Sequence, residues 1–459
     1  MLKLNKMTLL VLSTLVVGCA NIDDSYQATK QDFQQYEALT QQYHVKENWW
    51  SLYQDPQLNQ LVEQALENNK NLQKAAIAVN KALYHANLLG ANLVPSFSAK
   101  TGVGSSAAKN IETGGHSKIS HFASLELSYT LDLWRRLTDS ASAAEWNYKA
   151  TQQDLAAARL SLINAVVSTY YQIAYLNGVI ATSEESVKYY SQISRIMQNR
   201  FKLGVADSVS INQAQQAVLN AQNSLINYQT QRKMAEQTLR NFLNLKPQDP
   251  LQLTYPDILN VKTVGVNLNV PVSTIANRPD IKSTQFRLNA AFKDAKAMQK
   301  SWFPSITLGA SLSSSGNLIR NALENPIAAG TIGINLPFLN WHTVRWNVKI
   351  SEANYETAKL SFEQSITTAL NEIDTYYYSY QQAKAHFENM QKTYNNNKRI
   401  TQYYKNRYDV GVAQLRDWLN ASNAEKMAQM GILNAKYQLI QRENAVYSAM
   451  AGYYSPTDK

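Results

Sequence analysis

The sequence contains few of the residues that interrupt helices or cross-link small domains. Its 459 residues include only 16 Gly and 11 Pro, which favours long helices. The single Cys excludes an internal disulfide framework and a zinc site built on cysteines. Charged residues make up only 17% of the chain, below the roughly 25% of typical soluble domains. The formal net charge is +10, but the basic residues form no run, so no nucleic-acid partner is expected.

Neutral amides take the place of the missing charges. The chain has 43 Asn and 36 Gln, about as many side chains as all charged residues together. Apolar residues make up 45%, which excludes a disordered chain. The length suggests two or more structural units.

The first 18 residues have the features of a secretory signal peptide. Lys3 and Lys6 precede a short apolar stretch at 9–17, and the small residue Gly18 follows it. About nine apolar residues are too few to cross a bilayer, which needs about 20. We therefore expect this segment to be removed after export.

The only cysteine follows directly after this segment. Residues 15–19 resemble the bacterial lipobox, in which the Cys is diacylated and becomes the new N-terminus. Cys19 is the predicted lipidation site, and Ala20, in place of a retention-type Asp, points to the outer membrane. The polar residues after it predict a flexible or surface-lying leader.

An internal repeat organises the rest of the chain. The segment 200–206 recurs at 407–413, and the same offset aligns Trp134 with Trp341. The sequence therefore predicts a signal peptide, a lipidated leader, a first repeat, a Pro-rich linker and a second repeat. These are residues 1–18, 19–47, 48–250, 251–271 and 272–455.

Each half of the chain predicts a helix, two strands, a long helix, a turn and a second helix. The strand segments alternate apolar and polar residues, as strands with one apolar and one polar face do. They are residues 95–104, 122–131, 305–313 and 331–338. Their length suits strands that cross a membrane with the apolar face toward lipid and the polar face toward a lumen. Four strands cannot close a barrel, so several protomers would have to share one.

The segments 135–203 and 342–410 predict uninterrupted helices without Pro. Sixty-nine residues at 1.5 Å each give a helix of about 100 Å. The helices that follow carry apolar residues at spacings of three and four, which is typical of coiled-coil packing. Membrane-sized strands and long helices wetted on several sides favour a conduit. A non-conducting, envelope-spanning coiled-coil structural lipoprotein is the alternative from a different class.

Several motifs resemble the TolC-like outer-membrane efflux proteins, within them the lipoprotein branch that serves resistance-nodulation-division pumps. They are Trp49–Leu58, Ala276–Ile281 and Phe303–Ile306, in that order. The resemblance implies a mainly α fold with a small transmembrane β part. It further implies a homotrimer with a shared β-barrel and an α-helical tunnel.

The resemblance implies an outer-membrane duct that passively exports drugs or other small toxic compounds. Its partners would be a periplasmic membrane-fusion adaptor protein, an inner-membrane resistance-nodulation-division transporter and outer-membrane lipid. The exit duct of a type I protein-secretion system is the alternative within the family. No catalytic constellation or His-based metal motif is present in the sequence, so neither an enzyme nor a cofactor is expected, apart from the lipid on Cys19.

The candidate site residues lie at the turns and just beyond them. Gly allows the left-handed backbone that reverses a chain between antiparallel helices, and a cation suits a helix C-terminus. By resemblance, the adaptor-contacting tips are Arg200, Gly204, Val205, Arg407, Gly411 and Val412. The resemblance also places an aperture gate at Asp417 and Asn420, although Asn420 departs from the acidic residue common there. A solvated Asp that favours the helix dipole is the simpler interpretation of Asp417.

Cys19→Ala should abolish acylation, because no other cysteine is available to carry the lipid. The measurement is metabolic labelling of cells with radioactive palmitate, followed by isolation of the protein. A labelled Cys19→Ala protein would show that the lipoprotein prediction is wrong.

Overall fold

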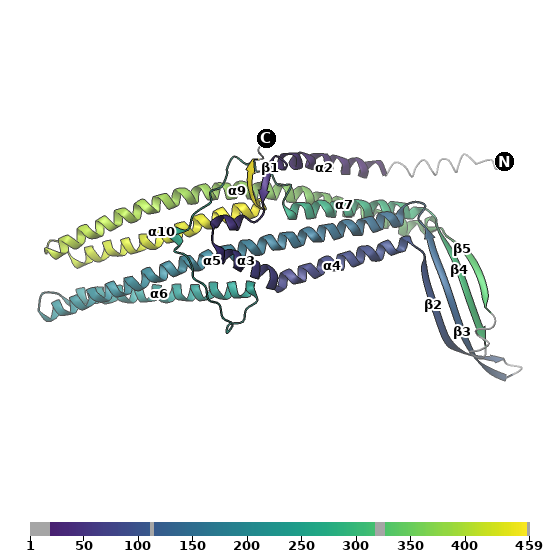
Figure 1. Ribbon diagram of the computed structural model, residues 1–459, viewed down its shortest axis with the longest axis horizontal. Helices are drawn as coiled ribbons and strands as arrows, with labels where there is room; N and C mark the ends of the chain where they lie inside the picture. Colours follow the sequence, from purple (N-terminus) through teal and green to yellow (C-terminus); the bar gives the residue numbers. More distant parts are fainter. Residues whose placement is uncertain (1–18, 111–113, 317–325, 457–459) are drawn as a thin grey trace. The chain divides into compact units, whose positions relative to one another are not determined.

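The computed structural model describes residues 19–110, 114–316 and 326–456, and it is mainly helical (Figure 1). The α-helices are α2 Cys19–Thr40, α3 Pro56–Asn68, α4 Lys70–Gly90, α5 Arg136–Lys202, α6 Ser208–Leu243, α7 Pro279–Gln299, α9 Trp341–Asp409 and α10 Leu415–Ala449. The strands are β1 Tyr43–Lys46, β2 Ser96–Asn110, β3 Gly114–Leu131, β4 Ser305–Gly316, β5 Ile327–Asn335 and β6 Tyr453–Pro456. Short 3-10 turns η1 to η5 lie at Trp49–Tyr53, Ala91–Leu93, Ile258–Asn260, Lys300–Trp302 and Pro337–Asn340.

The chain forms two compact units, and each contains parts of both sequence repeats. The first comprises the described parts of Met1–Gln34, Ala76–Asp154 and Asp280–Ser365. The second comprises Gln35–Ala75, Leu155–Pro279 and Ile366–Lys459. The predicted signal peptide, residues 1–18, lies outside the described residues.

The first unit contains an antiparallel sheet in the order β2-β3-β4-β5 (Figure 1). Its register places apolar residues in rows, for example Leu125 opposite Leu312, both about half exposed. On the other face, Lys100 Nζ lies 3.2 Å from a Glu126 carboxylate oxygen. The predicted two-faced strands are thus confirmed. The first pair is longer than expected, with 15 and 18 residues, because its distal part is rich in Ser, Ala and Gly and carries no apolar alternation.

Two further strands correct the predicted total of four. In the second unit, β1 pairs antiparallel with β6, with Tyr43 opposite Pro456. Each strand has only four residues, and the partners lie about 400 positions apart in the chain. Such short segments carry no readable alternation, so the sequence analysis missed them.

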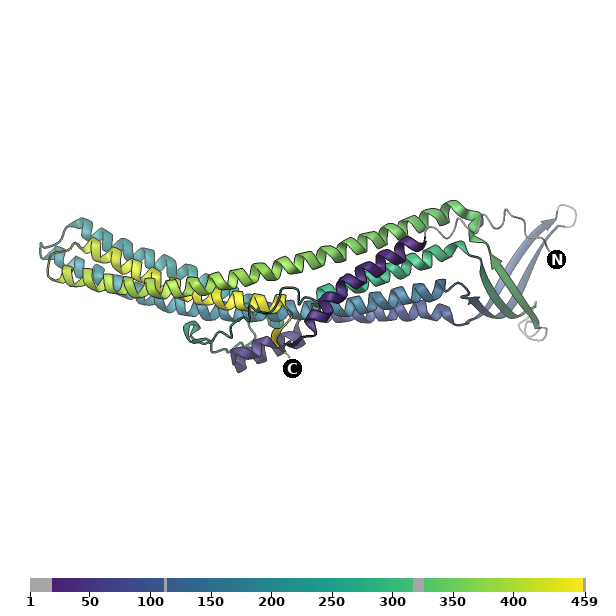
Figure 2. The same ribbon diagram turned by 90° about the horizontal axis from the view of Figure 1, so that it is seen from above.

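The leader forms the helix α2, which packs along the first unit, so of the two predicted alternatives it is surface-lying and not flexible. In α2, Tyr26 stacks on Phe292 with ring centroids 4.1 Å apart, and its hydroxyl donates to Asn289 at 2.9 Å. Phe33 packs edge-on against Phe362 at 5.2 Å. Figure 2 shows α2 lying beside α7 within the first unit. The residues of α2 that pack against the unit recur at helical spacing: Ile22, Tyr26, Thr29 and Phe33. Most residues between them are polar, so the apolar periodicity of this segment is weak.

The long helices α5 and α9 confirm the prediction to within one residue at each end. The one glycine inside α5, Gly178, lies against α10, where an added Cβ would approach Leu433 to 3.3 Å. Among the described residues, no helix is both long and apolar enough to cross a membrane.

The residues at the start of the first repeat, Trp49–Leu58, contribute to the core of the second unit. Trp49 is fully buried, and its indole Nε1 donates to Asn444 Oδ1 on α10 at 2.8 Å. Asp55 caps α3 by accepting from the backbone N–H of Leu58 at 3.1 Å, and it accepts from the Tyr170 hydroxyl at 2.8 Å. The apolar residues that recur along α10 at spacings of three and four are buried, which fits the predicted coiled-coil packing: Trp418, Ala421, Ala428, Ile432, Ala435, Leu439, Val446 and Ala449.

A buried carboxyl holds the inter-repeat linker. Glu443 on α10 is fully buried and accepts from the backbone N–H of Gly265. The Tyr447 hydroxyl donates to the Gly265 carbonyl at 2.7 Å. Burial raises the pKa of the Glu443 carboxyl, because the charged form loses its hydration.

Glu443→Gln should raise the thermal stability of the protein at neutral pH by roughly 2 °C. A carboxyl whose folded pKa lies above its unfolded value of about 4.5 destabilises the fold as pH rises through the folded pKa. The variant should therefore also flatten the dependence of Tm on pH above pH 4.5. The measurement is a Tm series from pH 4 to 8.

Glu425→Gln, on the same helix and only half-buried, is the matched control and should behave as wild type. A Glu443→Gln protein with an unchanged pH profile would contradict this account of the carboxyl.

Candidate functional site

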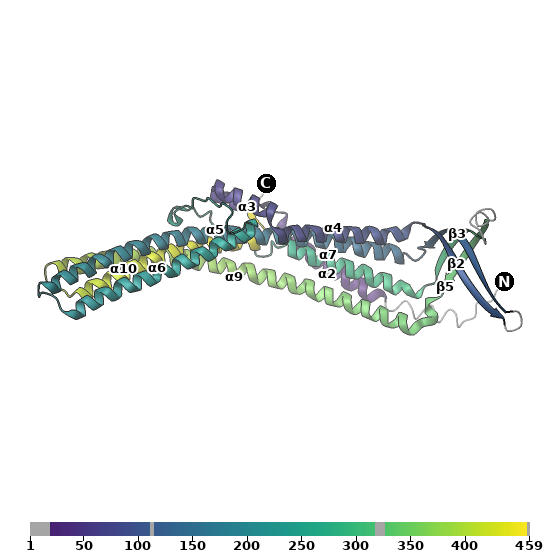
Figure 3. The ribbon, with the colours of Figure 1, turned by 90° about the horizontal axis from the view of Figure 1, so that it is seen from below.

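Each of the two helical hairpins in the second unit has a turn between its helices, and the two turns are equivalent (Figure 3). The α5–α6 turn contains Gly204 with φ +72°, and the α9–α10 turn contains Gly411 with φ +76°. This confirms the prediction that glycine supplies a left-handed backbone at both turns. An added Cβ would meet no atom within 4 Å at either glycine, so the requirement is one of backbone conformation alone.

Both turns end their helices in the same hydrogen-bonded motif. The N–H of Val205 donates to the Arg200 carbonyl at 2.9 Å, and the N–H of Gly204 donates to Phe201 at 2.9 Å. The equivalent bonds in the second copy join Val412 to Arg407 at 2.9 Å and Gly411 to Tyr408 at 3.0 Å. These are Schellman motifs with glycine at the C′ position. They explain why the segment around each glycine repeats so closely in the sequence.

The turns expose aliphatic side chains on both sides of each glycine. Leu203 is 78% exposed and Val410 is 73% exposed, and Val205 and Val412 are also exposed. A short turn that presents four aliphatic side chains to solvent has the character of a contact surface. We call this surface the tips, defined by Leu203, Val205, Val410 and Val412.

The two predicted tip arginines differ in their contacts. Arg200 crosses to the other hairpin, where its Nη1 donates to the Tyr408 hydroxyl at 2.8 Å. Arg407 instead donates to Tyr403 one turn earlier on its own helix, at 3.0 Å. Position 408 aligns with Phe201 of the first copy, so only the second copy offers a hydroxyl. Arg200 therefore ties the hairpins together near the tips, while Arg407 remains exposed.

The predicted gate residues begin α10. The backbone N–H of Gln414 donates to Asp417 Oδ2 at 3.3 Å, so this carboxylate caps the first turn. In the first copy the cap is supplied from a different position, where Asp207 accepts from the N–H of Ser210 at 2.8 Å. Asp417 thus lies in the first turn of α10, as the helix-dipole interpretation expects, and it also caps that turn. Its role in a gate remains a prediction.

Asn420 lines a polar groove of the second unit. The groove has a volume of about 580 Å³ and lies between α5, α6 and α10. Its lining is rich in neutral polar side chains with two cations, including Ser186, Gln216, Asn220, Asn423, Arg416 and Lys426. Asp417 is not among its lining residues. The structure thus places the two predicted gate residues close in sequence but in different surroundings.

No cluster of side chains that could hold a metal ion is present among the described residues. Within residues 19–110, 114–316 and 326–456, no group of three or more His, Cys, Asp or Glu could hold a metal ion. Cys19 is the first residue of α2, and its side chain lies outside the described part of the structure.

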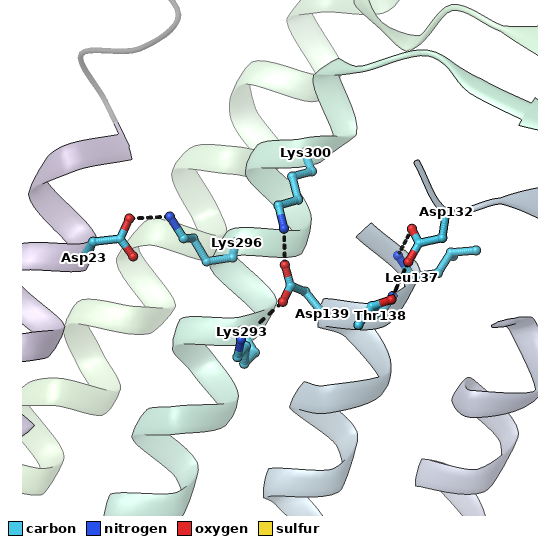
Figure 4. Close-up of polar contacts among 8 residues, drawn as sticks. All are labelled: Asp23, Asp132, Leu137, Thr138, Asp139, Lys293, Lys296 and Lys300. Atoms are coloured by element: carbon cyan, nitrogen blue, oxygen red, sulfur yellow. Dashed lines mark hydrogen bonds and ion pairs between the residues drawn. The ribbon is translucent and has the colours of Figure 1, made fainter. Parts of the chain in front are cut away.

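One charged cluster of the first unit was not predicted from the sequence. The Asp139 carboxylate on α5 pairs with Lys293 Nζ at 3.3 Å and with Lys300, both from the second repeat (Figure 4). The spacing of Lys293, Lys296 and Lys300 by three and four residues was a readable signal for one helix face. The pairing with a residue about 150 positions earlier could not be read from the sequence.

These features define a class of protein in which long antiparallel helical hairpins join a small two-faced β-sheet. A sequence model of the outer membrane efflux protein family matches residues 61–245 and 270–452. The chain is 63% identical over 456 residues to the Toxin and drug export protein A of Aggregatibacter actinomycetemcomitans, covering 99% of both chains.

More distant relatives agree. The chain is 24% identical over 462 residues to the probable outer membrane lipoprotein SilC of Salmonella typhimurium, covering 97% of this chain and 99% of the relative. The solved Campylobacter jejuni CmeC outer membrane channel has the same fold, with a TM-score of 0.79, 23% identity and 90% coverage of each chain. The chain belongs to the outer membrane efflux protein family, which confirms the resemblance and the outer-membrane location.

Proposed function

We propose that this protein is the exit duct of a tripartite pump and passively exports drugs or other small toxic compounds. The observation that carries the proposal is the β2–β5 sheet, which has an apolar face and two edges without a strand partner among the described residues. Such edges leave backbone groups unpaired, which costs several kcal/mol per group in hydrocarbon. Pairing β2 of one protomer with β5 of the next satisfies both edges, and a homotrimer closes the ring.

Polar surfaces on the sheet and on the helices support the proposal of a water-filled lumen. The polar face of the sheet carries Lys100 and Glu126, and the groove beside α6 and α10 is lined mainly by amides and hydroxyls. Amides and hydroxyls hydrogen-bond to water without the strong fields of clustered charges. A non-conducting structural lipoprotein would not require a sheet with one polar face.

The tips are the surface we assign to the periplasmic membrane-fusion adaptor, which in turn would meet the inner-membrane resistance-nodulation-division transporter. Exposed aliphatic side chains near a basic residue favour a partner with apolar grooves. Cys19 would carry the lipid that anchors each protomer in the outer membrane, in keeping with the relative SilC, which is a probable outer membrane lipoprotein.

A second candidate function is the exit duct of a type I protein-secretion system. The Aggregatibacter relative is named for both toxin and drug export, so its name is compatible with either cargo. A strain that lacks this gene should become drug-sensitive if the first function holds. It should retain a secreted protein in the periplasm or cytoplasm if the second one does.

Asp417→Asn should raise the single-channel conductance of the protein in planar bilayers by about twofold or more. Symmetry would bring three Asp417 carboxylates together at a narrow aperture, where they would bind cations and slow their passage. Asn retains the acceptor that caps α10, so the substitution removes the charge and leaves the cap.

Asp207→Asn is the matched control, because this carboxylate caps α6 at the equivalent helix start. It should leave the conductance unchanged. Equal single-channel conductance of wild type and Asp417→Asn at every pH would exclude Asp417 from the gate. A protein that never conducts would favour the alternative of a non-conducting structural lipoprotein.

Val205→Asp combined with Val412→Asp should prevent docking without closing the duct. A strain that depends on this protein should lose drug resistance by roughly fourfold or more with the double variant, since charge in an apolar contact costs several kcal/mol. Leu219→Asp, at a 53% exposed site within α6, is the control and should retain resistance. Full resistance with the double variant would exclude the tips as the docking surface.

A further inference from the structure

A basic pocket lies in the first unit between α2, α5 and α7. Figure 4 shows two carboxylates and three lysines that line it. Its volume is about 300 Å³. The charged side chains that line it are Asp23, Arg135, Asp139, Lys293, Lys296 and Lys300. Four cations therefore face two carboxylates, which leaves two positive charges in excess.

The carboxylates hold the lysines in place but do not neutralise the pocket. Asp139, with only 7% of its side chain exposed, pairs with both Lys293 and Lys300. Asp23 on the leader helix pairs with Lys296, whose side chain is 22% exposed. Arg135 makes no ion pair with any described residue, and its φ of +60° places it at the bend between β3 and α5. Arg135 is exposed at the mouth of the pocket, while the three lysines are partly buried. Four cations that share two carboxylates can bind an anion by charge-assisted hydrogen bonds.

The α5 N-terminus does not supply this binding site. Asp132 already accepts from the backbone N–H groups of Leu137 at 2.9 Å and Thr138 at 2.8 Å, and from the Thr138 hydroxyl at 2.6 Å. These contacts satisfy the first turn of the helix (Figure 4). The anion would thus be held by the side chains of the pocket.

The pocket lies close to the ends of the strands. β3 ends at Leu131, four residues before Arg135, and β4 begins five residues after Lys300. Beside it, Trp134 stacks on Phe303 with centroids 4.7 Å apart. Tryptophan is enriched where a membrane protein meets the headgroups of the lipids.

The lipidated residue is also near. Cys19 begins α2 four residues before Asp23, which corresponds to about 6 Å along a helix. If the sheet spans the outer membrane as proposed above, both the acyl chains and the pocket lie at headgroup level. The inference rests on that placement.

We propose that this pocket binds the phosphate of an anionic phospholipid headgroup at the periplasmic surface of the outer membrane. Lysine and arginine are the side chains that recognise phosphate, Lys as point charges and Arg through its fork of N–H donors. Free phosphate offers the same chemistry, but the strand ends, the tryptophan and the acylated residue all favour a lipid. The bound lipid would connect α2 of the leader with α5 and α7 beside the sheet.

The test is native mass spectrometry of the full-length protein in detergent, titrated with phosphatidylglycerol. Arg135→Gln combined with Lys296→Gln should weaken the binding of the first lipid roughly ten- to thirtyfold, since two cations are removed. Both lysines that pair with the buried Asp139 remain, so the fold keeps these ion pairs. Asp23→Asn should strengthen binding severalfold, because it releases Lys296 from its carboxylate.

Arg345→Gln combined with Lys349→Gln is the matched control. These cations lie near the start of α9 in the same unit, where Arg345 lies over the Trp346 ring and Lys349 pairs with Glu352. The control removes the same charge from a surface that does not line the pocket, so lipid binding should persist.

Equal losses in both double variants would overturn the proposal, because they would indicate diffuse attraction to any basic surface. Inorganic phosphate that displaces the lipid at equal concentration would also overturn it, since the site would then recognise a free anion. Wild-type protein that binds no phosphatidylglycerol would do the same. Single-channel conductance of each variant, expected to equal wild type, separates failure of this site from failure of the duct.

Discussion

The hydrogen-bonding needs of two strand edges govern the proposed architecture. β2 and β5 each pair on one side only among the described residues, and their sheet presents apolar side chains on one face. In hydrocarbon no water is available to satisfy the free backbone groups. A sheet that spans the membrane as proposed requires strands from neighbouring chains at both edges, and the proposed duct would then exist only as an assembly of several chains. Each other part of the molecule is built onto a protomer that is incomplete in the membrane.

The two helical hairpins share the same backbone turn but differ in their polar contacts. Both turns use the same glycine-based motif, but the caps of the following helices come from Asp207 in one copy and Asp417 in the other. Only the first copy's arginine reaches across to the neighbouring hairpin, through the Tyr408 hydroxyl. A duplicated chain can thus keep a backbone plan while its polar contacts diverge. The abundance of Asn and Gln fits helices whose surfaces face water on several sides.

Local signals in the sequence predicted the elements with strong periodicity. The long helices lack Pro and could be placed to within one residue, and alternation located the four strands of the large sheet. The leader helix was missed because only a few apolar residues, such as Tyr26 and Phe33, mark its packed face. β1 and β6 were missed because four residues are too few to show a period.

Contacts between distant residues were beyond sequence reasoning. The sequence around Asp139 does not indicate that Lys293 and Lys300 pair with it. The sequence around Glu443 likewise does not indicate that the backbone N–H of Gly265 in the linker donates to it. Sequence patterns do predict the two glycine turns, because a helix end depends on its own neighbours. They do not predict a pocket that is assembled from both repeats and the leader.

Disulfide cross-linking between protomers tests the central claim most directly. The only native cysteine, Cys19, is expected to be acylated, so one cysteine introduced on β2 and one scanned along β5 would be the only free thiols. Closure between neighbours predicts that one register gives covalent species that end at three chains, while either single-cysteine variant stays uncross-linked. Monomers in every register, or a ladder that continues beyond three chains, would contradict the shared sheet.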